Sequence, residues 1–134
     1  MSKIINISEA ASIAIYSIVA IARSKEKLNA TELAISINVS RNHLAKVMQQ
    51  LTKYGYLISD RGPKGGFKLN KLPDEICLLD LFELVEGNIE DISCMGDCAV
   101  CPFKDCVFGG LASKLTNEFK NYLMNTKISD LIHI

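Results

Sequence analysis

The sequence predicts a mainly α-helical fold with one small β-hairpin, and three observations lead to this prediction. Apolar residues recur at intervals of three and four over most of the chain, as they do on amphipathic helices. Around residues 56–69 this spacing gives way to two short apolar runs separated by a glycine-rich turn. The apolar fraction of 49% over 134 residues is enough for a real core, so we expect one compact domain, with or without an appended helix.

Three helices are expected before the hairpin. Ser8 can cap a first helix over residues 9–24, and residues 29–32 have the form of a capping box that begins a short second helix. After a tight connection, Ser40 can cap a third helix, which ends where Gly55 supplies a C-terminal stop. The apolar residues that recur at helical spacing in this third helix, and that we expect to be buried, are Leu44, Val47, Met48 and Leu51.

The hairpin and the remaining elements follow in order. Strands are expected at residues 56–59 and 67–69, on either side of a Gly/Pro turn. A fourth helix is expected to open at Pro73 and to end at Gly87, and the segment 94–106 has no periodicity, so it should be a loop. A last helix carries an apolar stripe, either a dimer seam or a face packed on its own domain, made of Phe108, Leu111, Leu115, Phe119 and Tyr122 or Leu123.

This order of elements is that of a winged helix-turn-helix, in which the hairpin is the wing. We therefore assign residues 1–72 to a winged helix-turn-helix domain. Residues 73–134 are expected to form a region that contains a cysteine loop and a long C-terminal dimerisation helix. No apolar run approaches the roughly 18 residues that a membrane span needs, and there is no secretion signal, so we expect a cytoplasmic protein without a membrane partner.

The net charge of zero conceals two oppositely charged segments. Residues 41–71 contain seven Lys or Arg and one acidic residue, whereas residues 74–106 contain nine Asp or Glu and one Lys. Charge clusters are often only solvated faces, but this asymmetry suggests two surfaces with different roles. The basic segment covers the third helix and the hairpin, so these elements are the candidates for contact with a polyanion.

The third helix and the hairpin turn carry the residues that we expect to contact double-stranded DNA. With its apolar stripe buried, the first turn of that helix presents polar side chains that can donate to phosphates and base edges, although His43 can equally be a packed cap residue. The turn combines cations with glycines that let a backbone approach closely, as in a wing along phosphates or in a minor groove. The candidate DNA-contacting residues are Arg41, Asn42, His43 and Lys46 in the helix and Arg61, Lys64, Gly65 and Gly66 in the turn. A protein-interaction module is the alternative, but the basic turn and the polar helix face together favour DNA.

Four of the five cysteines lie within thirteen residues, at Cys94, Cys98, Cys101 and Cys106. In a reducing compartment such a cluster is more typical of a metal site or a redox sensor than of disulfides. Thiolates suit iron in iron–sulfur clusters, four cysteines can complete a tetrahedral zinc site, and a metal-free thiol switch is a third alternative. Cys77 stands apart and is expected to be a small core residue on the fourth helix.

The residues from 29 to 69 resemble the Rrf-two family of bacterial winged-helix regulators, which includes iron–sulfur sensors of the IscR and NsrR types. The resemblance rests on Gly55-Tyr56-Leu57, Arg61-Gly62 and Gly65-Gly66-Phe67-Lys68-Leu69, and it continues through Leu84-Val85-Glu86-Gly87, the clustered cysteines and the last helix. It implies a homodimer that binds a palindromic operator, usually as a repressor. In sensing members three loop cysteines hold a [2Fe–2S] or [4Fe–4S] cluster, and the remaining ligand is not cysteine and can come from the partner subunit.

Carried over by position, the resemblance implies Cys94, Cys101 and Cys106 as ligands and leaves Cys98 as an extra thiol. The IscR type has a histidine three residues after the last cysteine, where this chain has Gly109. The NsrR type uses an acidic residue near the start of the first helix, donated across the dimer, and Glu9 matches that position as a candidate fourth ligand. An acid in a first helical turn is also favoured by the helix dipole alone. On this basis a [4Fe–4S] cluster is preferred over [2Fe–2S], with zinc as the alternative metal.

The expected function is therefore a DNA-binding regulator whose operator binding is controlled by an iron–sulfur cluster that senses redox state, nitric oxide or iron–sulfur status. The alternatives are a winged-helix regulator with structural zinc or a thiol switch, and a redox protein that does not bind DNA. We expect no enzyme activity. The chain has two histidines and no Trp, and it shows neither a nucleotide fingerprint nor a nucleophile–base pair at a recognisable spacing.

Overall fold

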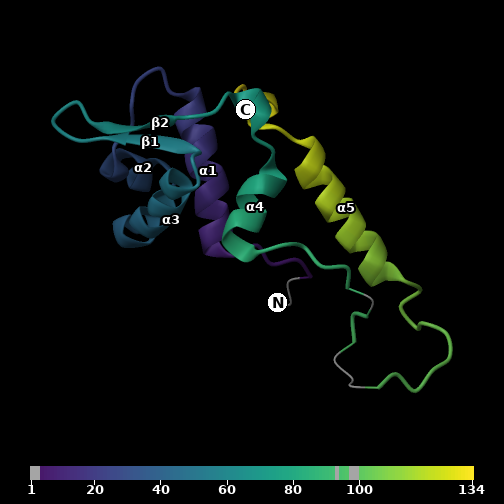
Figure 1. Ribbon diagram of the computed structural model, residues 1–134. Coiled ribbons are helices and arrows are strands. Elements are labelled where there is room, and N and C mark those ends of the chain that lie inside the picture. The colour runs from purple at the N-terminus through teal and green to yellow at the C-terminus, as the bar shows by residue number, and fades with distance from the viewer. Residues whose placement is uncertain (1–3, 93, 97–99) are drawn as a thin grey trace.

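The computed structural model describes residues 4–92, 94–96 and 100–134. Helices α1 to α3 and the hairpin form one body, α4 packs beside α1, and α5 extends away from that body, with the cysteine loop between α4 and α5 (Figure 1). The elements in chain order are α1 (Glu9–Arg23), α2 (Ala30–Ser36), α3 (Arg41–Lys53), β1 (Leu57–Asp60), β2 (Gly66–Leu69), a 3₁₀ turn η1 (Pro73–Glu75), α4 (Leu78–Glu86), α5 (Leu111–Asn125) and α6 (Ile128–Leu131). The winged helix-turn-helix predicted from the sequence is confirmed.

Helix α1 lies at the centre of the core. It begins where predicted, because the Ser8 side chain accepts a hydrogen bond from the backbone N–H of Ala11 at 3.1 Å. Helices α3 and α4, strand β2 and α6 all contact α1, so more than one face of the helix is covered. Its buried residues are Ala11, Ile13, Ala14, Ser17, Ile18 and Ile21. No helix of the described residues is long and apolar enough to cross a membrane.

The helix-turn-helix unit is defined by its caps. The backbone N–H of Glu32 donates to the Asn29 side chain at 2.8 Å, and the Glu32 carboxylate accepts in return from the Asn29 N–H, so the predicted capping box is present. Asn38, at φ +56°, turns the chain between the helices. Ser40 then caps α3 by accepting from the His43 N–H at 3.2 Å. The four apolar residues predicted to be buried in α3 are all buried.

The wing is attached to the body through the segment between α1 and α2. Its strands pair in antiparallel register, from Leu57 opposite Leu69 to Asp60 opposite Gly66. The backbone N–H of Phe67 donates to the Leu28 carbonyl at 2.8 Å, and Lys27 forms an ion pair with Asp60. The hairpin is therefore held against the helical core from outside the sheet.

Substituting Gly66 with alanine is expected to destabilise the fold through this attachment. Gly66 is buried at φ +155°, and a Cβ there would lie 2.8 Å from the Leu28 carbonyl oxygen. We expect the free energy of unfolding to fall by about 1–3 kcal/mol, measured by urea denaturation. Gly62→Ala is the matched control, because Gly62 has a positive φ but open space around it. Equal losses in the two variants would contradict a steric cause.

The prediction that a helix begins at Pro73 is wrong for the residues before Leu78. Residues Pro73–Glu75 form a 3₁₀ turn, and α4 begins only at Leu78. Between them the fully buried Ile76 is extended, because its carbonyl accepts from the Ile128 N–H at 2.9 Å and so pairs with the C-terminal segment. Cys77, predicted to be a core residue on this helix, instead lies half-buried at its N-cap.

The C-terminal part of the chain contains two helices where one was predicted. Helix α5 begins at Leu111, so the exposed Phe108 precedes it, and the unpredicted α6 places the fully buried Ile128 in the core. Toward α4, Phe119 packs edge-to-face on Phe82 with the ring centres 5.5 Å apart. Part of the apolar stripe therefore packs on its own chain.

Candidate nucleic-acid interface and cysteine loop

Helix α3 presents a polar stripe directly opposite its buried face. At 100° per residue, Asn42, Lys46, Gln49 and Lys53 point in nearly the same direction, and all four are exposed. Asn42 and Lys46 were predicted from the sequence, whereas Gln49 and Lys53 were not, although the same helical spacing would have identified them. Arg41 is exposed at the start of the helix. The stripe is long enough to follow a groove over several base pairs.

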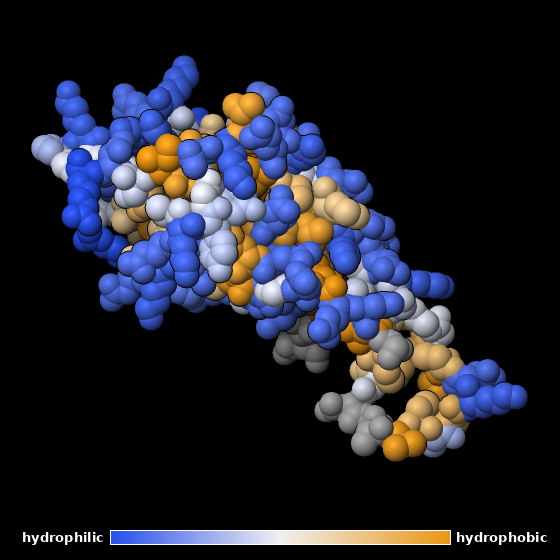
Figure 2. Space-filling view, in the orientation of Figure 1, coloured by the Kyte–Doolittle hydropathy of each residue, from blue (hydrophilic) through white to orange (hydrophobic). Residues whose placement is uncertain are grey.

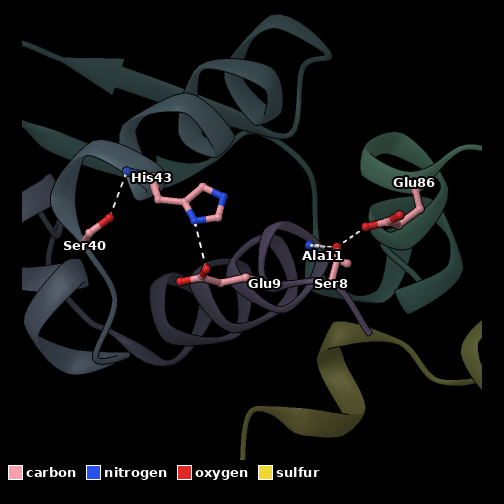
Figure 3. Close-up of polar contacts among 6 residues, drawn as sticks. All are labelled: Ser8, Glu9, Ala11, Ser40, His43 and Glu86. Carbon is pink, nitrogen blue, oxygen red and sulfur yellow. Dashed lines mark hydrogen bonds and ion pairs between the residues drawn. The ribbon is translucent and has the colours of Figure 1, made fainter. Parts of the chain in front are cut away.

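His43 faces a different element from the other predicted contact residues. Its ring Nδ1 lies 3.3 Å from a carboxylate oxygen of Glu9 in the first turn of α1 (Figure 3). The His43 side chain is 34% exposed and that of Glu9 is 62% exposed. His43 thus connects α3 to α1, and its side chain is not part of the outward stripe.

The wing tip is cationic, and its glycines are required by the fold itself. Arg61 and Lys64 are exposed, and Figure 2 shows hydrophilic side chains gathered at the hairpin end of the molecule. A Cβ on Gly65 would lie 2.4 Å from the Asp60 carbonyl oxygen, just as one on Gly66 would meet Leu28. Both glycines therefore allow the tight turn to form, which positions the two cations.

The acidic residue of the wing is neutralised within the chain. Lys27 hydrogen bonds to the Asp60 carboxylate, and this contact together with the Lys27 charge holds the pKa of Asp60 below its usual range. Asp60 stays ionised at neutral pH, but its charge is paired. The positive potential of Arg61 and Lys64 is therefore little opposed at the tip.

The loop cysteines that the structure describes are accessible. Cys94, Cys101 and Cys106 are all exposed between α4 and α5, and Cys98 lies outside the described residues. Among the described residues no three His, Cys, Asp or Glu side chains converge as a metal site. In this conformation the structure does not bring the predicted ligands together, and Glu9 faces His43 rather than the loop.

The surroundings of Cys106 favour its thiolate form, and Cys94 lies beside apolar side chains. Backbone hydrogen bonding from Gly110, and then from Phe108 and Gly109, lowers the pKa of the Cys106 thiol. Cys94 lines a largely apolar cavity of about 790 Å³ with Phe82 and Phe119. By contrast, burial raises the pKa of Cys77, which keeps that thiol protonated.

The N-terminal end of α1 contacts both α3 and α4, and α4 leads into the cysteine loop. Ser8 donates to the Glu86 carboxylate in the last turn of α4, and the next residue, Glu9, faces His43 of α3 (Figure 3). Glu86 is followed by Gly87, at φ +84°, where α4 ends and the chain leaves toward the cysteines. Sequence patterns contain no signal for this pair of contacts, because the partners are distant along the chain.

The family model for Rrf2 (Rrf-two), described as an iron-dependent transcriptional regulator, matches residues 7–134. The chain belongs to the Rrf2 family of transcriptional regulators. A helix-turn-helix transcriptional regulator of Aquifex aeolicus is 33% identical over 106 residues, which are 77% of this chain and 74% of the relative. The regulator NsrR of Bacillus licheniformis is 28% identical over 113 residues, 81% of this chain and 78% of its own. The family resemblance drawn from the sequence is confirmed, and this Rrf2 protein is a DNA-binding transcription regulator.

Solved structures share the fold of this Rrf2 regulator. CymR, the global cysteine regulator of B. subtilis, superposes with a TM-score of 0.78 at 23% identity and covers 97% of this chain and 98% of its own. IscR of T. potens gives a TM-score of 0.74 at 18% identity, over 96% of this chain and 87% of its own. At such identities the likeness shows the fold alone.

Proposed function

We propose that this Rrf2 regulator binds a palindromic operator as a homodimeric repressor, and that a [4Fe–4S] cluster on the cysteine loop controls this binding. The observation that carries the proposal is the first turn of α1, where Ser8 contacts Glu86 of α4 and Glu9 contacts His43 of α3. A change in the loop that moves α4 can therefore reach α3 through these two contacts. We also propose that residues 1–72 contact DNA and that residues 73–134 sense and dimerise.

The DNA interface is assigned to the outward face of α3 and to the wing. Arg41, Asn42 and Lys46 are exposed in α3, and Arg61 and Lys64 are exposed at the wing tip. Cations on both elements can contact phosphates on either side of a groove, while Asn42 suits an adenine edge. We propose that Gly65 and Gly66 contribute by forming the tight turn that positions Arg61 and Lys64, and that His43 lies at the rim of the interface.

Dimerisation is assigned to α5 and the adjoining loop. Leu111, Tyr122 and Met124 of α5 are exposed on sides that α4 does not cover, and they are 43%, 61% and 45% accessible. The loop also exposes Val100 and Phe103, at 82% and 62%. Apolar side chains in such number favour burial against a second copy, and a two-fold dimer matches a palindromic site.

Cys94, Cys101 and Cys106 would hold the cluster, with Glu9 as the fourth ligand and Cys98 as an additional thiol. Thiolates are the donors that iron–sulfur clusters require, and the lowered pKa of Cys106 fits this use. A cluster held there supplies iron that is sensitive to redox state and nitric oxide. Because Glu9 faces His43 rather than the loop, its side chain would have to turn away from His43 to serve as a ligand, and α3 would then lose that contact.

A thiol switch without metal is the second candidate function. CymR, which has the same fold, is described as a cysteine regulator, and one solved CymR structure is of an oxidised form. Exposed thiols, of which Cys106 has a lowered pKa, are also suited to reversible oxidation. Structural zinc on the same cysteines is the remaining alternative.

Anaerobic purification followed by iron, sulfide and zinc counts tests the proposal, together with binding to a selected DNA duplex before and after metal removal. We expect about four iron and four sulfide per chain, and DNA affinity that changes when they are removed. Glu9→Gln should lose cluster occupancy, whereas His43→Gln, which breaks the same contact from the other side, should keep it and alter DNA affinity. A single zinc per chain, or equal affinity with and without the cluster, would contradict the switch.

A further inference from the structure

A cleft of about 520 Å³ lies between α3 and the wing, and of its lining residues the proposed function uses only Arg61. Its floor is apolar, formed in part by Met48 and Phe67, and its rim is polar. The polar rim comes from two elements, namely Gln49, Thr52 and Lys53 of α3 and Ser59 and Arg61 of the hairpin. The cleft therefore lies where a recognition helix in a major groove and a wing in the adjacent groove would leave one nucleic-acid strand between them.

The charge of the cleft matches such a strand. Lys53 and Arg61 are both exposed, on α3 and on the wing, and no acidic residue lines the cleft. Within the described residues neither cation takes part in an ion pair, and the adjacent Asp60 is paired with Lys27. Lys53 Nζ lies 5.8 Å from the centre of the Tyr54 ring, a contact that leaves its charge without an acidic partner. Two such cations around an uncharged polar rim attract a phosphodiester, whereas they repel another cationic surface.

Gln49 is placed to read a base beside that strand. It lies two turns beyond Asn42 on the same outward stripe, so their Cα atoms are about 10 Å apart along the helix, about three base-pair steps. Its side chain is exposed and has no hydrogen-bond partner among the described residues, which leaves both the donor and the acceptor of the amide available. A glutamine amide pairs with adenine N6 and N7 in the major groove.

We propose that this cleft holds the backbone strand between the two grooves, with Lys53 and Arg61 on its phosphates, and that Gln49 specifies an adenine in each operator half-site. The inference rests on the proposed DNA binding and adds a second point of specificity at the far end of the recognition helix. The effects of Gln49 and Lys53 can then be separated. A base contact by Gln49 determines which DNA sequence is preferred, whereas a phosphate contact by Lys53 raises the affinity for every sequence.

Selection from a random duplex library, with the full chain as isolated anaerobically and after metal removal, tests these roles. The wild type should select a site with a defined adenine, and Gln49→Ala should lose that preference by about tenfold or more. Gln49→Glu should shift the preference to cytosine, whose amino group donates to a carboxylate. Lys53→Ala should weaken all duplexes alike and lower the slope of log affinity against log salt by about 1.

Gln50→Ala is the matched control, because Gln50 is exposed on α3 but does not line the cleft, and it should select the wild-type site. Thermal unfolding of each variant should match that of the wild type, since all three side chains are exposed. An unchanged selected site for Gln49→Ala and Gln49→Glu, or an unchanged salt slope for Lys53→Ala, would overturn the inference while DNA binding stands. If the wild type selects no duplex in either form, the proposed function itself is overturned, and the inference with it.

Discussion

The Cys106→Ser variant is expected to lack the iron and sulfide that we expect in the anaerobically purified wild type. Backbone hydrogen bonds, first from Gly110 and then from Phe108, lower the pKa of the Cys106 thiol, so it is converted to thiolate more easily than an ordinary cysteine. A serine hydroxyl stays protonated at neutral pH and is a harder donor than sulfur. Loss of an outer-shell partner typically costs a metal site 10- to 100-fold in affinity, so loss of a ligand should cost more than about tenfold.

Iron and sulfide analysis, with the visible absorption spectrum, measures this loss. Cys77→Ser is the control, since Cys77 is half-buried, its thiol is kept protonated by burial, and serine is itself a good N-cap for α4. That variant should retain its iron. Cys98→Ser tests the additional thiol in the same way and should also retain the cluster. Full occupancy in the Cys106→Ser variant would show that the ligand set is another one.

The double variant Lys46→Ala/Arg61→Ala is expected to weaken binding to a selected operator duplex by about a hundredfold or more. The two side chains are exposed on separate elements, α3 and the wing tip, so the variant removes a cation from each arm of the interface. Each such contact is worth about 1–3 kcal/mol at a base edge, and each phosphate contact adds about 1 to the salt slope. Contacts on separate elements add nearly independently.

Gel-shift titration at several salt concentrations measures both quantities. Lys127→Ala is the matched control, because Lys127 is an exposed lysine between α5 and α6, outside α3, the wing and the proposed dimerisation helix. It lowers the net charge without touching the proposed interface. If the control weakens binding as much as a single Lys46→Ala variant does, net charge rather than a defined interface determines affinity, and the assignment of α3 and the wing is wrong.

The sequence predicted those parts of the fold that depend on neighbouring residues. Ser8, Asn29 and Ser40 cap their helices through hydrogen bonds that span three residues, so the local pattern was sufficient. The prediction failed at Pro73, because Ile76 is held extended by a hydrogen bond from Ile128, fifty-two positions later. Helical propensity contains no term for such a partner.

The same distinction applies to the candidate site. The exposed cations of α3 followed from periodicity, since burying one face of a helix leaves the opposite face exposed. Those of the wing followed from the Gly/Pro turn between two short strands. The contact between Glu9 and His43 could not be predicted, because it depends on how α1 and α3 pack. The glycines of the wing were assigned to DNA, yet their close neighbours are the carbonyls of Asp60 and Leu28. A glycine in the sequence therefore does not show whether the group that approaches it belongs to DNA or to the chain's own backbone.

The pairing of Ile76 with Ile128 also affects how the protein is made. Ile128 is fully buried in the same core as α1, and α6 contacts both α1 and the segment at Pro73. A ribosome that has synthesised only the first hundred residues has therefore made every residue that we propose to contact DNA, but the core beneath them still lacks Ile128. Messages cut short within the cysteine loop or α5 should yield chains that are degraded, and so competition at operators from regulators that lack a sensor is avoided during translation.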